Sequence, residues 1–192
     1  MNNHWKELIG SFLSAIGTIQ AAIGNTPQFH LAQQQNDQLR LIGNVLQALG
    51  SGLSADGQGS FSLEKLGDEL QAVGNSTVVA GMLMYGKTDT ITEQKFSITG
   101  TWMQALGSFV GLGDEFFDST TDGRIENIIG NLLQGIGNSL QAIGGIQDLH
   151  DGHSEQSQIG VVGSWIQSVG SVISLIGQIL EEAEEIRLNM DE

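Results

Sequence analysis

The sequence predicts an all-α protein, built as an antiparallel multi-helix bundle or a layered helical array. Three observations lead to this prediction: glycines recur every seven residues, the residues between them repeat with a helical period, and polar links separate six segments. Glycine accounts for 27 of the 192 residues and proline for one. Because disordered chains are usually rich in proline and charge, this composition favours a folded chain.

The glycine heptad is the main signal in the chain. It comprises sixteen of the 27 glycines: Gly10, Gly17, Gly24, Gly43, Gly50, Gly67, Gly74, Gly81, Gly100, Gly107, Gly130, Gly137, Gly144, Gly163, Gly170 and Gly177. Glycine inside a helix costs about 1 kcal/mol relative to alanine. Small residues can offset that cost because they let helix backbones approach closely. We therefore predict that these sixteen glycines are helix-packing positions.

The residues between the glycines repeat as well, as 43–50, 100–107 and 163–170 show. With glycine as position one, position two is small and polar, position four is usually apolar, and position five is often Gln. Position six is usually Ala or Ser, and position seven is Ile, Leu or Val. At about 100° per residue, positions three, four and seven form an apolar stripe, and positions two and five form a narrow polar strip. A strict seven-residue repeat favours a left-handed supercoil.

The repeat predicts helices near 4–24, 38–53, 62–84, 97–117, 124–147 and 159–188. Polar links at 25–28, 51–60, 86–93, 118–123 and 150–155 separate them, and Pro27 ends the first helix. Short links favour antiparallel neighbours. The chain is then one repetitive domain, 1–192, or two halves, 1–90 and 91–192, divided at the third link.

Charge and motif content exclude several functions. The formal net charge is −15 and there are seven basic residues, so no basic stripe exists to bind nucleic acid. The absence of cysteine excludes disulfides and thiolate sites. No nucleophile elbow, phosphate loop or zinc-protease motif is present. We therefore predict a protein that is not an enzyme, with no catalytic residues, no cofactor-binding residues and no cofactor.

Two polar links carry weak candidates for metal ligands. Asp118 and Asp122 fall at the spacing of a calcium loop, but Ile129 occupies the twelfth position, where such loops place a bidentate Glu. The second link groups Asp148, His150, Asp151 and His153, a set that suits a transition metal. Nothing else in the sequence completes either site, so capped turns between helices are the simpler interpretation.

The uncharged helix faces indicate self-association. Residues 8–36 and 159–180 carry no charge, whereas a solvated helix face normally carries Glu and Lys pairs. We expect the Gln, Ser and Asn strips to line subunit contacts, so that the protein is its own partner in a homo-oligomer or larger assembly. Trp5, Trp102 and Trp165 each lie five residues before a heptad glycine, and we interpret them as core or interface anchors.

A membrane-active or apolar-surface-binding bundle is the alternative. Residues 159–180 are long enough to span a bilayer, but Ser and Gln residues interrupt them and flanking basic anchors are scarce. The first ten residues lack the basic region and cleavage site of a secretory signal peptide. The expectation is therefore synthesis in the cytoplasm, with lysis as a route of release.

The repeated motif also carries a resemblance. It appears as Trp165-Ile-Gln-Ser-Val-Gly170, Trp102-Met-Gln-Ala-Leu-Gly107 and Leu140-Gln-Ala-Ile-Gly144. In these residues the chain resembles a group of repetitive proteins from spore-forming Bacillus-type bacteria. The resemblance implies an association with the spore, and it implies no activity and no site residues.

Overall fold

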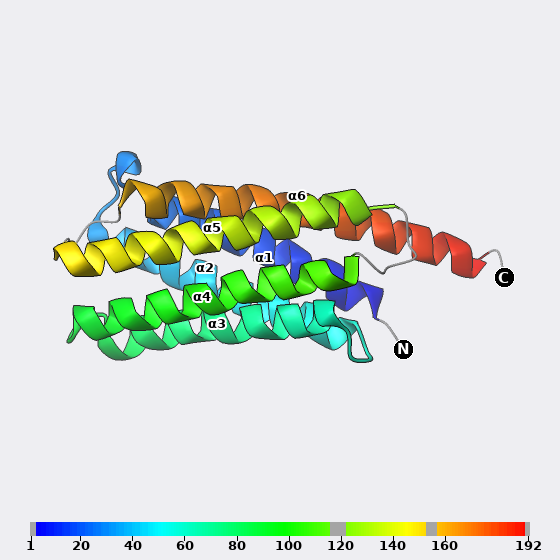
Figure 1. The fold of residues 1–192 in the computed structure, drawn as a ribbon, viewed down its shortest axis with the longest axis horizontal. Coiled ribbons are helices and arrows are strands. Elements are labelled where there is room, and N and C mark those ends of the chain that lie inside the picture. Colours follow the sequence, from blue (N-terminus) through cyan, green and yellow to red (C-terminus); the bar gives the residue numbers. More distant parts are fainter. Residues whose placement is uncertain (1–2, 116–121, 153–156, 191–192) are drawn as a thin grey trace.

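The computed structural model describes residues 3–115, 122–152 and 157–190. Over these residues the chain forms α-helices and one short 3-10 turn, without a strand (Figure 1). The elements are α1 (His4–Gly24), η1 (Pro27–Phe29), α2 (Gln33–Gly57), α3 (Leu63–Tyr85), α4 (Thr90–Glu115), α5 (Arg124–Asp151) and α6 (Gln158–Met190). The all-α bundle predicted from the heptads is confirmed.

Two of the predicted links are partly helical. The link predicted at 51–60 is helical as far as Gly57, because Gly57 packs closely on α1: a Cβ there would lie 3.1 Å from the Glu7 amide nitrogen. The link predicted at 86–93 already contains the first turn of α4. The Asp89 side chain caps that turn by accepting a hydrogen bond from the Thr92 amide at 3.0 Å. The predicted end of the fourth helix, residue 117, lies outside the described residues.

The six helices form a closed ring of antiparallel hairpins. The hairpins α1–α2, α3–α4 and α5–α6 make the most extensive contacts, and α2–α3, α4–α5 and α1–α6 join them side by side. In Figure 1 the helices run nearly parallel to the long axis, with the two ends of the chain on the same side. Consecutive helices are therefore neighbours, and the contact between α1 and α6 closes the ring.

Reciprocal glycine pairs hold each hairpin together. A Cβ on Gly17 would lie 2.6 Å from the Gly43 carbonyl oxygen, and a Cβ on Gly43 would lie 2.6 Å from that of Gly17. The same relation joins Gly10 with Gly50, Gly67 with Gly107, Gly74 with Gly100, Gly130 with Gly170, and Gly137 with Gly163. The other four heptad glycines, Gly24, Gly81, Gly144 and Gly177, meet other atoms of the facing helix. A side chain at any paired position would collide with backbone.

The ring is inverted relative to a water-soluble bundle. Its buried apolar residues, among those described, are Ala15, Ala21, Ala22, Ala55, Val78, Ala105 and Ala142. The polar strip of positions two and five faces inward, and the large apolar residues of positions three and seven face outward. The Gln, Ser and Asn strips, which we expected at subunit contacts, line the interior of this single chain.

Helix geometry explains the inversion. On the helical wheel, position one lies at 0°, position five at about 40°, position two at about 100° and position six at about 140°. The small residues at positions one and six therefore flank the polar strip more closely than the apolar stripe. When each helix packs its glycine edge on one neighbour and its alanine or serine edge on the other, the polar strip must point into the ring.

Candidate functional site

The polar interior is the candidate site. Each of the six helices contributes buried polar side chains, and most of these occupy heptad positions two and five: Thr18, Gln47, Ser51, Ser54, Asn75, Gln104, Ser108, Gln134, Asn138, Ser164, Gln167, Ser171 and Gln178. Several of the hydroxyl and amide groups bond to the backbone of their own helix, as Ser108 Oγ does to the Gln104 carbonyl at 3.1 Å. Others bond to side chains of a different helix, as Gln134 Nε2 does to Ser174 Oγ at 3.0 Å.

Four glutamines from four helices form a hydrogen-bonded layer across the interior. Gln167 Nε2 in α6 donates to Gln47 Oε1 in α2 at 2.9 Å and to Gln104 Oε1 in α4 at 3.4 Å. Gln141 Nε2 in α5 donates to Gln167 Oε1 at 2.9 Å. All four occupy heptad position five. We call Gln47, Gln104, Gln141 and Gln167 the glutamine layer.

Two cavities lie along the axis, on either side of this layer. The smaller has a volume of about 60 Å³ and takes lining residues from all six helices, among them Ser14, Gln71 and Gln134. The larger has a volume of about 1620 Å³, and the glutamine layer forms part of its wall. Since a water molecule needs roughly 10–15 Å³ of cavity volume, even the smaller cavity has room for several water molecules.

The charged residues of the interior sit at its two mouths. Glu64 and Asp68, near the start of α3, line the smaller cavity, and no basic side chain lines it among the described residues. At the same end of the ring, the buried Glu182 pairs with His4 and accepts a hydrogen bond from Gln178 Nε2 at 3.1 Å. The larger cavity has a mixed mouth, where Arg40 lies 3.6 Å from Glu93. One mouth is therefore acidic and the other nearly balanced.

Burial raises the pKa of the Asp68 carboxyl to about 7. A hydrogen bond from Gln58 Nε2 at 3.0 Å acts in the opposite direction, because it favours the carboxylate, but it is the weaker effect. At a pH between about 3.8, the ordinary pKa of an Asp carboxyl, and about 7, Asp68 holds a proton in the folded chain that it has lost in the unfolded chain. Because the unfolded chain loses this proton first, the fold becomes less stable as the pH rises through this interval.

Asp68→Asn should raise the thermal midpoint at pH 8 and leave it nearly unchanged at pH 4. Because water near the mouth of the cavity weakens the effect of burial, we expect the free energy of unfolding at pH 8 to rise by only about 1 kcal/mol. In a chain of this length this corresponds to a rise of about 2–4 °C in the thermal midpoint. Circular dichroism melts of the purified chain measure it. The control is Asp56→Asn: the ion pair with Lys6 lowers the pKa of Asp56, so removing that carboxylate should give no gain at pH 8. Equal gains for both variants would contradict this assignment.

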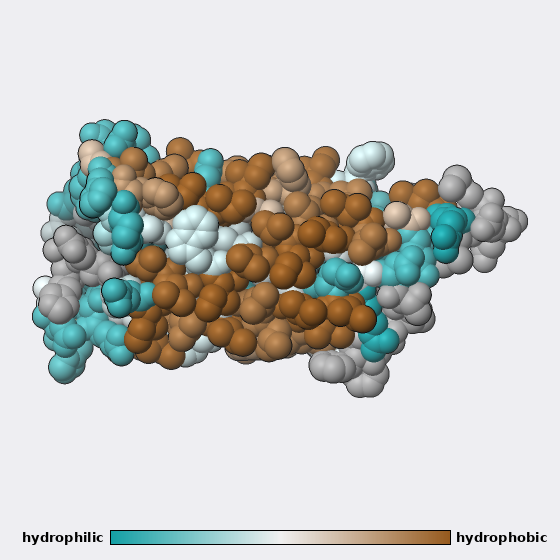
Figure 2. Space-filling model, turned by 90° about the horizontal axis from the view of Figure 1, so that it is seen from above, coloured by the Kyte–Doolittle hydropathy of each residue, from teal (hydrophilic) through white to brown (hydrophobic). Residues whose placement is uncertain are grey.

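The outer surface is the second part of the candidate site. Large apolar side chains are exposed on every helix, including Phe12 on α1, Leu49 on α2, Val73 on α3, Leu106 on α4, and Ile136 and Ile176 on α5 and α6. Figure 2 shows apolar residues covering the middle of one face, with hydrophilic residues gathered at both ends. We call this exposed apolar surface the apolar belt.

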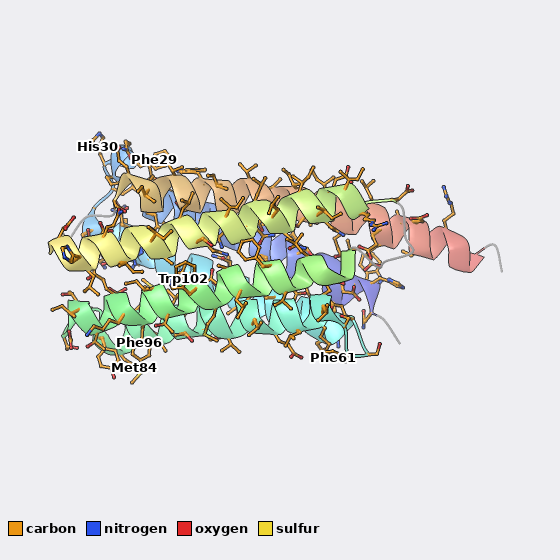
Figure 3. The ribbon with its side chains drawn as sticks, in the orientation of Figure 1. Phe29, His30, Phe61, Met84, Phe96 and Trp102 are labelled. Carbon is orange, nitrogen blue, oxygen red and sulfur yellow. The ribbon has the colours of Figure 1, made fainter. Side chains whose placement is uncertain are left out.

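The tryptophans do not form a core. Trp5 is 73% exposed, and Trp102, which is labelled in Figure 3, is 41% exposed. Trp165 is half-buried, and its Nε1 donates to Thr26 Oγ1 at 2.9 Å beside the ring of Phe29. Trp5 and Trp102 are therefore not core anchors, and their interpretation as interface anchors stays a prediction.

The metal candidates that lie within the described residues do not converge on one point. Asp148 is buried and accepts a hydrogen bond from the Ser157 amide at 3.0 Å, so it caps the start of α6. The His150 side chain is 87% exposed and pairs with Asp151. Asp122 is exposed, and its amide donates to Glu184 at 2.9 Å. Asp118 and His153 lie outside the described residues, and within those residues no three potential ligands cluster.

Comparison with known proteins gives a family and no activity. No curated protein and no solved structure matches the chain significantly. A family model matches residues 5–175, which include fifteen of the sixteen heptad glycines, all but Gly177, and the whole glutamine layer. The chain belongs to this family, DUF6944, a family of unknown function.

Proposed function

We propose that this protein is a membrane-embedded helical bundle, whose apolar belt contacts lipid and whose polar interior is shielded from it. The observation that carries the proposal is the inversion: the buried apolar side chains are alanines and one valine, while the large apolar side chains lie outside. In water the hydrophobic effect favours the opposite arrangement. In a bilayer the apolar surface is solvated by lipid, and polar groups must be satisfied internally.

The packing supports the same proposal. Helices in a bilayer gain no hydrophobic energy from burying leucine, so they associate through small residues and polar contacts. The glycine pairs supply the close backbone contacts, and the glutamine layer supplies side-chain hydrogen bonds between helices. An exposed hydroxyl of the belt is also satisfied locally, since Ser76 Oγ donates to the Ala72 carbonyl of its own helix at 2.8 Å.

The dimensions of the belt fit a bilayer. Charge is absent from one segment of each helix, 8–24, 41–55, 70–86, 96–113, 127–147 and 158–180. At 1.5 Å per residue these segments are ~22 to ~34 Å long, which brackets the ~30 Å of a hydrocarbon core. Within them, the exposed polar side chains are Ser76, Thr99, Gln147 and Gln158, and the last two lie at segment ends.

Two helices also satisfy a test of length and composition for spanning segments: α1 and the 158–184 stretch of α6. Core helices of soluble proteins and signal sequences satisfy the same test, so it carries little weight alone. Core helices, however, are mostly buried, whereas 44% of the α1 window and 39% of the α6 window are buried here. The large apolar side chains that are exposed in each window, such as Phe12 in α1 and Ile176 in α6, belong to the apolar belt.

Flotation on a density gradient tests the proposal. The full chain is mixed in mild detergent with phosphatidylcholine, which avoids repulsion between the acidic chain and anionic lipid, and the detergent is then removed. We expect the protein to float with the vesicles and to resist alkaline extraction. We also expect Trp102 fluorescence to be quenched by lipids brominated in their acyl chains. Recovery of the protein in the lipid-free fraction would overturn the proposal.

Self-association is the second candidate function, and the continuous apolar belt favours it. A second copy could cover this surface instead of lipid, so the subunit contact would be apolar rather than the polar strip expected from the sequence. Light scattering in detergent-free buffer distinguishes the two. Discrete oligomers or filaments that ignore added vesicles would support assembly, whereas a species that is soluble only with detergent or lipid would support membrane insertion.

The setting in a spore-forming cell is also part of the proposal. The resemblance to Bacillus-type repetitive proteins suggests a membrane of the sporulating cell or of the spore as the location. Immunodetection in membrane fractions of vegetative cells, sporulating cells and purified spores tests this location. Detection only in the soluble fraction of all three would contradict it.

A further inference from the structure

The glutamine layer interrupts a polar passage that otherwise runs the length of the ring. On one side the larger cavity extends from Gln104 and Gln167 toward the turn between α3 and α4. On the other side the smaller cavity begins about one helical turn further along, at Ser51, Gly107 and Ser171, and extends toward Glu64 and Gln178. The passage is therefore blocked at the level where Gln47, Gln104 and Gln167 meet.

The layer joins helices that are not neighbours in the ring. Gln47 is on α2, Gln104 on α4 and Gln167 on α6, so the two bonds donated by Gln167 Nε2 cross the interior instead of running along its wall. All three side chains are buried. Amide side chains that cross a passage close it without placing a charge in it, and rotation about their side-chain bonds would open it without moving a helix.

The chemistry of the walls indicates what could pass. Hydroxyl, amide and glycine groups line the smaller cavity, and its only charged residues among those described are Glu64 and Asp68. Rings of acidic side chains favour cations over anions in channels. The acidic mouth would therefore concentrate cations at the entrance, and the polar wall would replace part of their hydration shell.

We propose, resting on the membrane function above, that the interior is a water-filled conduit for small monovalent cations, held closed by the hydrogen-bonded glutamine layer. The wild-type chain conducts little because the layer is intact. Shortening Gln167 removes both bonds that cross to α2 and α4, together with the bond from Gln141. The cavities on either side then become continuous.

Potassium flux into phosphatidylcholine vesicles containing the full chain tests the conduit. We expect Gln167→Ala to raise the flux by about tenfold, the factor that follows when roughly one or two net hydrogen bonds no longer hold the layer closed. The matched control is Gln147→Ala, which removes an exposed glutamine near the end of α5 that is outside both cavity walls. This control should leave the flux unchanged.

Further variants and a dye-release measurement distinguish ion conduction from disruption of the bilayer or of the fold. Gln167→Asn keeps an amide but is too short to reach both partners, so it should also raise the flux while the melting curve stays close to wild type. Release of the large anionic dye calcein would indicate a disrupted bilayer and would overturn the conduit. In the Gln167→Ala background, Glu64→Gln with Asp68→Asn should reduce the preference for potassium over chloride.

The two proposals fail in different ways. If all variants float with vesicles but neither Gln167→Ala nor Gln167→Asn raises the flux, the conduit is overturned and the membrane bundle stands, with the interior acting only as internal hydrogen bonding. If the wild type does not float, the membrane proposal fails and the conduit fails with it. A flux increase in Gln147→Ala equal to that in Gln167→Ala would overturn the assignment of the layer.

Discussion

Gly17→Ala is expected to lower the thermal midpoint of the bundle by about 3–10 °C, the equivalent of roughly 1–3 kcal/mol of overpacking in a chain of this size. The new Cβ would lie 2.6 Å from the Gly43 carbonyl oxygen and 3.0 Å from the Gln47 amide nitrogen. Both atoms belong to the backbone of α2, so they cannot move aside as a flexible side chain would. The α1–α2 hairpin must separate to admit one methyl group.

Gly52→Ala is the matched control, because it makes the same substitution in a helix of the same hairpin. No atom lies within 4 Å of a Cβ built at Gly52. The substitution should therefore show only the helix-propensity gain of about 1 kcal/mol, and the midpoint should rise. Circular dichroism melts of both variants in the same detergent measure the difference. If both variants were stabilised, the glycine pairs would not be close contacts in the folded protein.

The fold class and the helix positions could be predicted from the sequence because both depend on local pattern. The seven-residue spacing of glycine requires a helical period, and Pro27 ends the first helix where the sequence predicts it. The predicted bounds failed where tertiary contact extended a helix, as at Gly57 against Glu7. A local pattern contains no information about such a contact, because the two residues are far apart in the chain.

The site was not located from the sequence, because the hydrophobic period alone is equally compatible with an apolar stripe that faces inward or outward. The usual assumption for a soluble chain places Leu and Ile inside and Gln outside. The signal that could have reversed this assumption was present: positions one and six, both small, flank positions two and five more closely than positions three and seven. Gln47, Gln104 and Gln167 are equivalent in three heptads, yet only the closed ring brings their amide groups together.

Leu106→Arg is expected to have the second large effect, because it places a fixed charge in the middle of the apolar belt. Leu106 is 53% exposed on α4 and lies near the centre of the uncharged segment 96–113. A charge at the centre of a spanning helix costs about 2.5–3.5 kcal/mol, and arginine cannot lower this cost by losing its proton. The lipid concentration that gives half-maximal flotation should therefore rise by about 100-fold.

The control for this prediction lies on the same helix, outside the belt. Ile91 is as exposed as Leu106, at 55%, but it is in the first turn of α4 among the charged residues Glu93 and Lys95. In a bilayer Ile91→Arg would sit at the interface and cost little, so flotation should stay close to wild type. In water neither substitution would matter to a monomer, since exposed positions tolerate charge within about 0.5 kcal/mol. An apolar environment around the middle of the ring makes the two arginines differ, so the contrast between them tests the environment of the fold independently of whether the interior conducts.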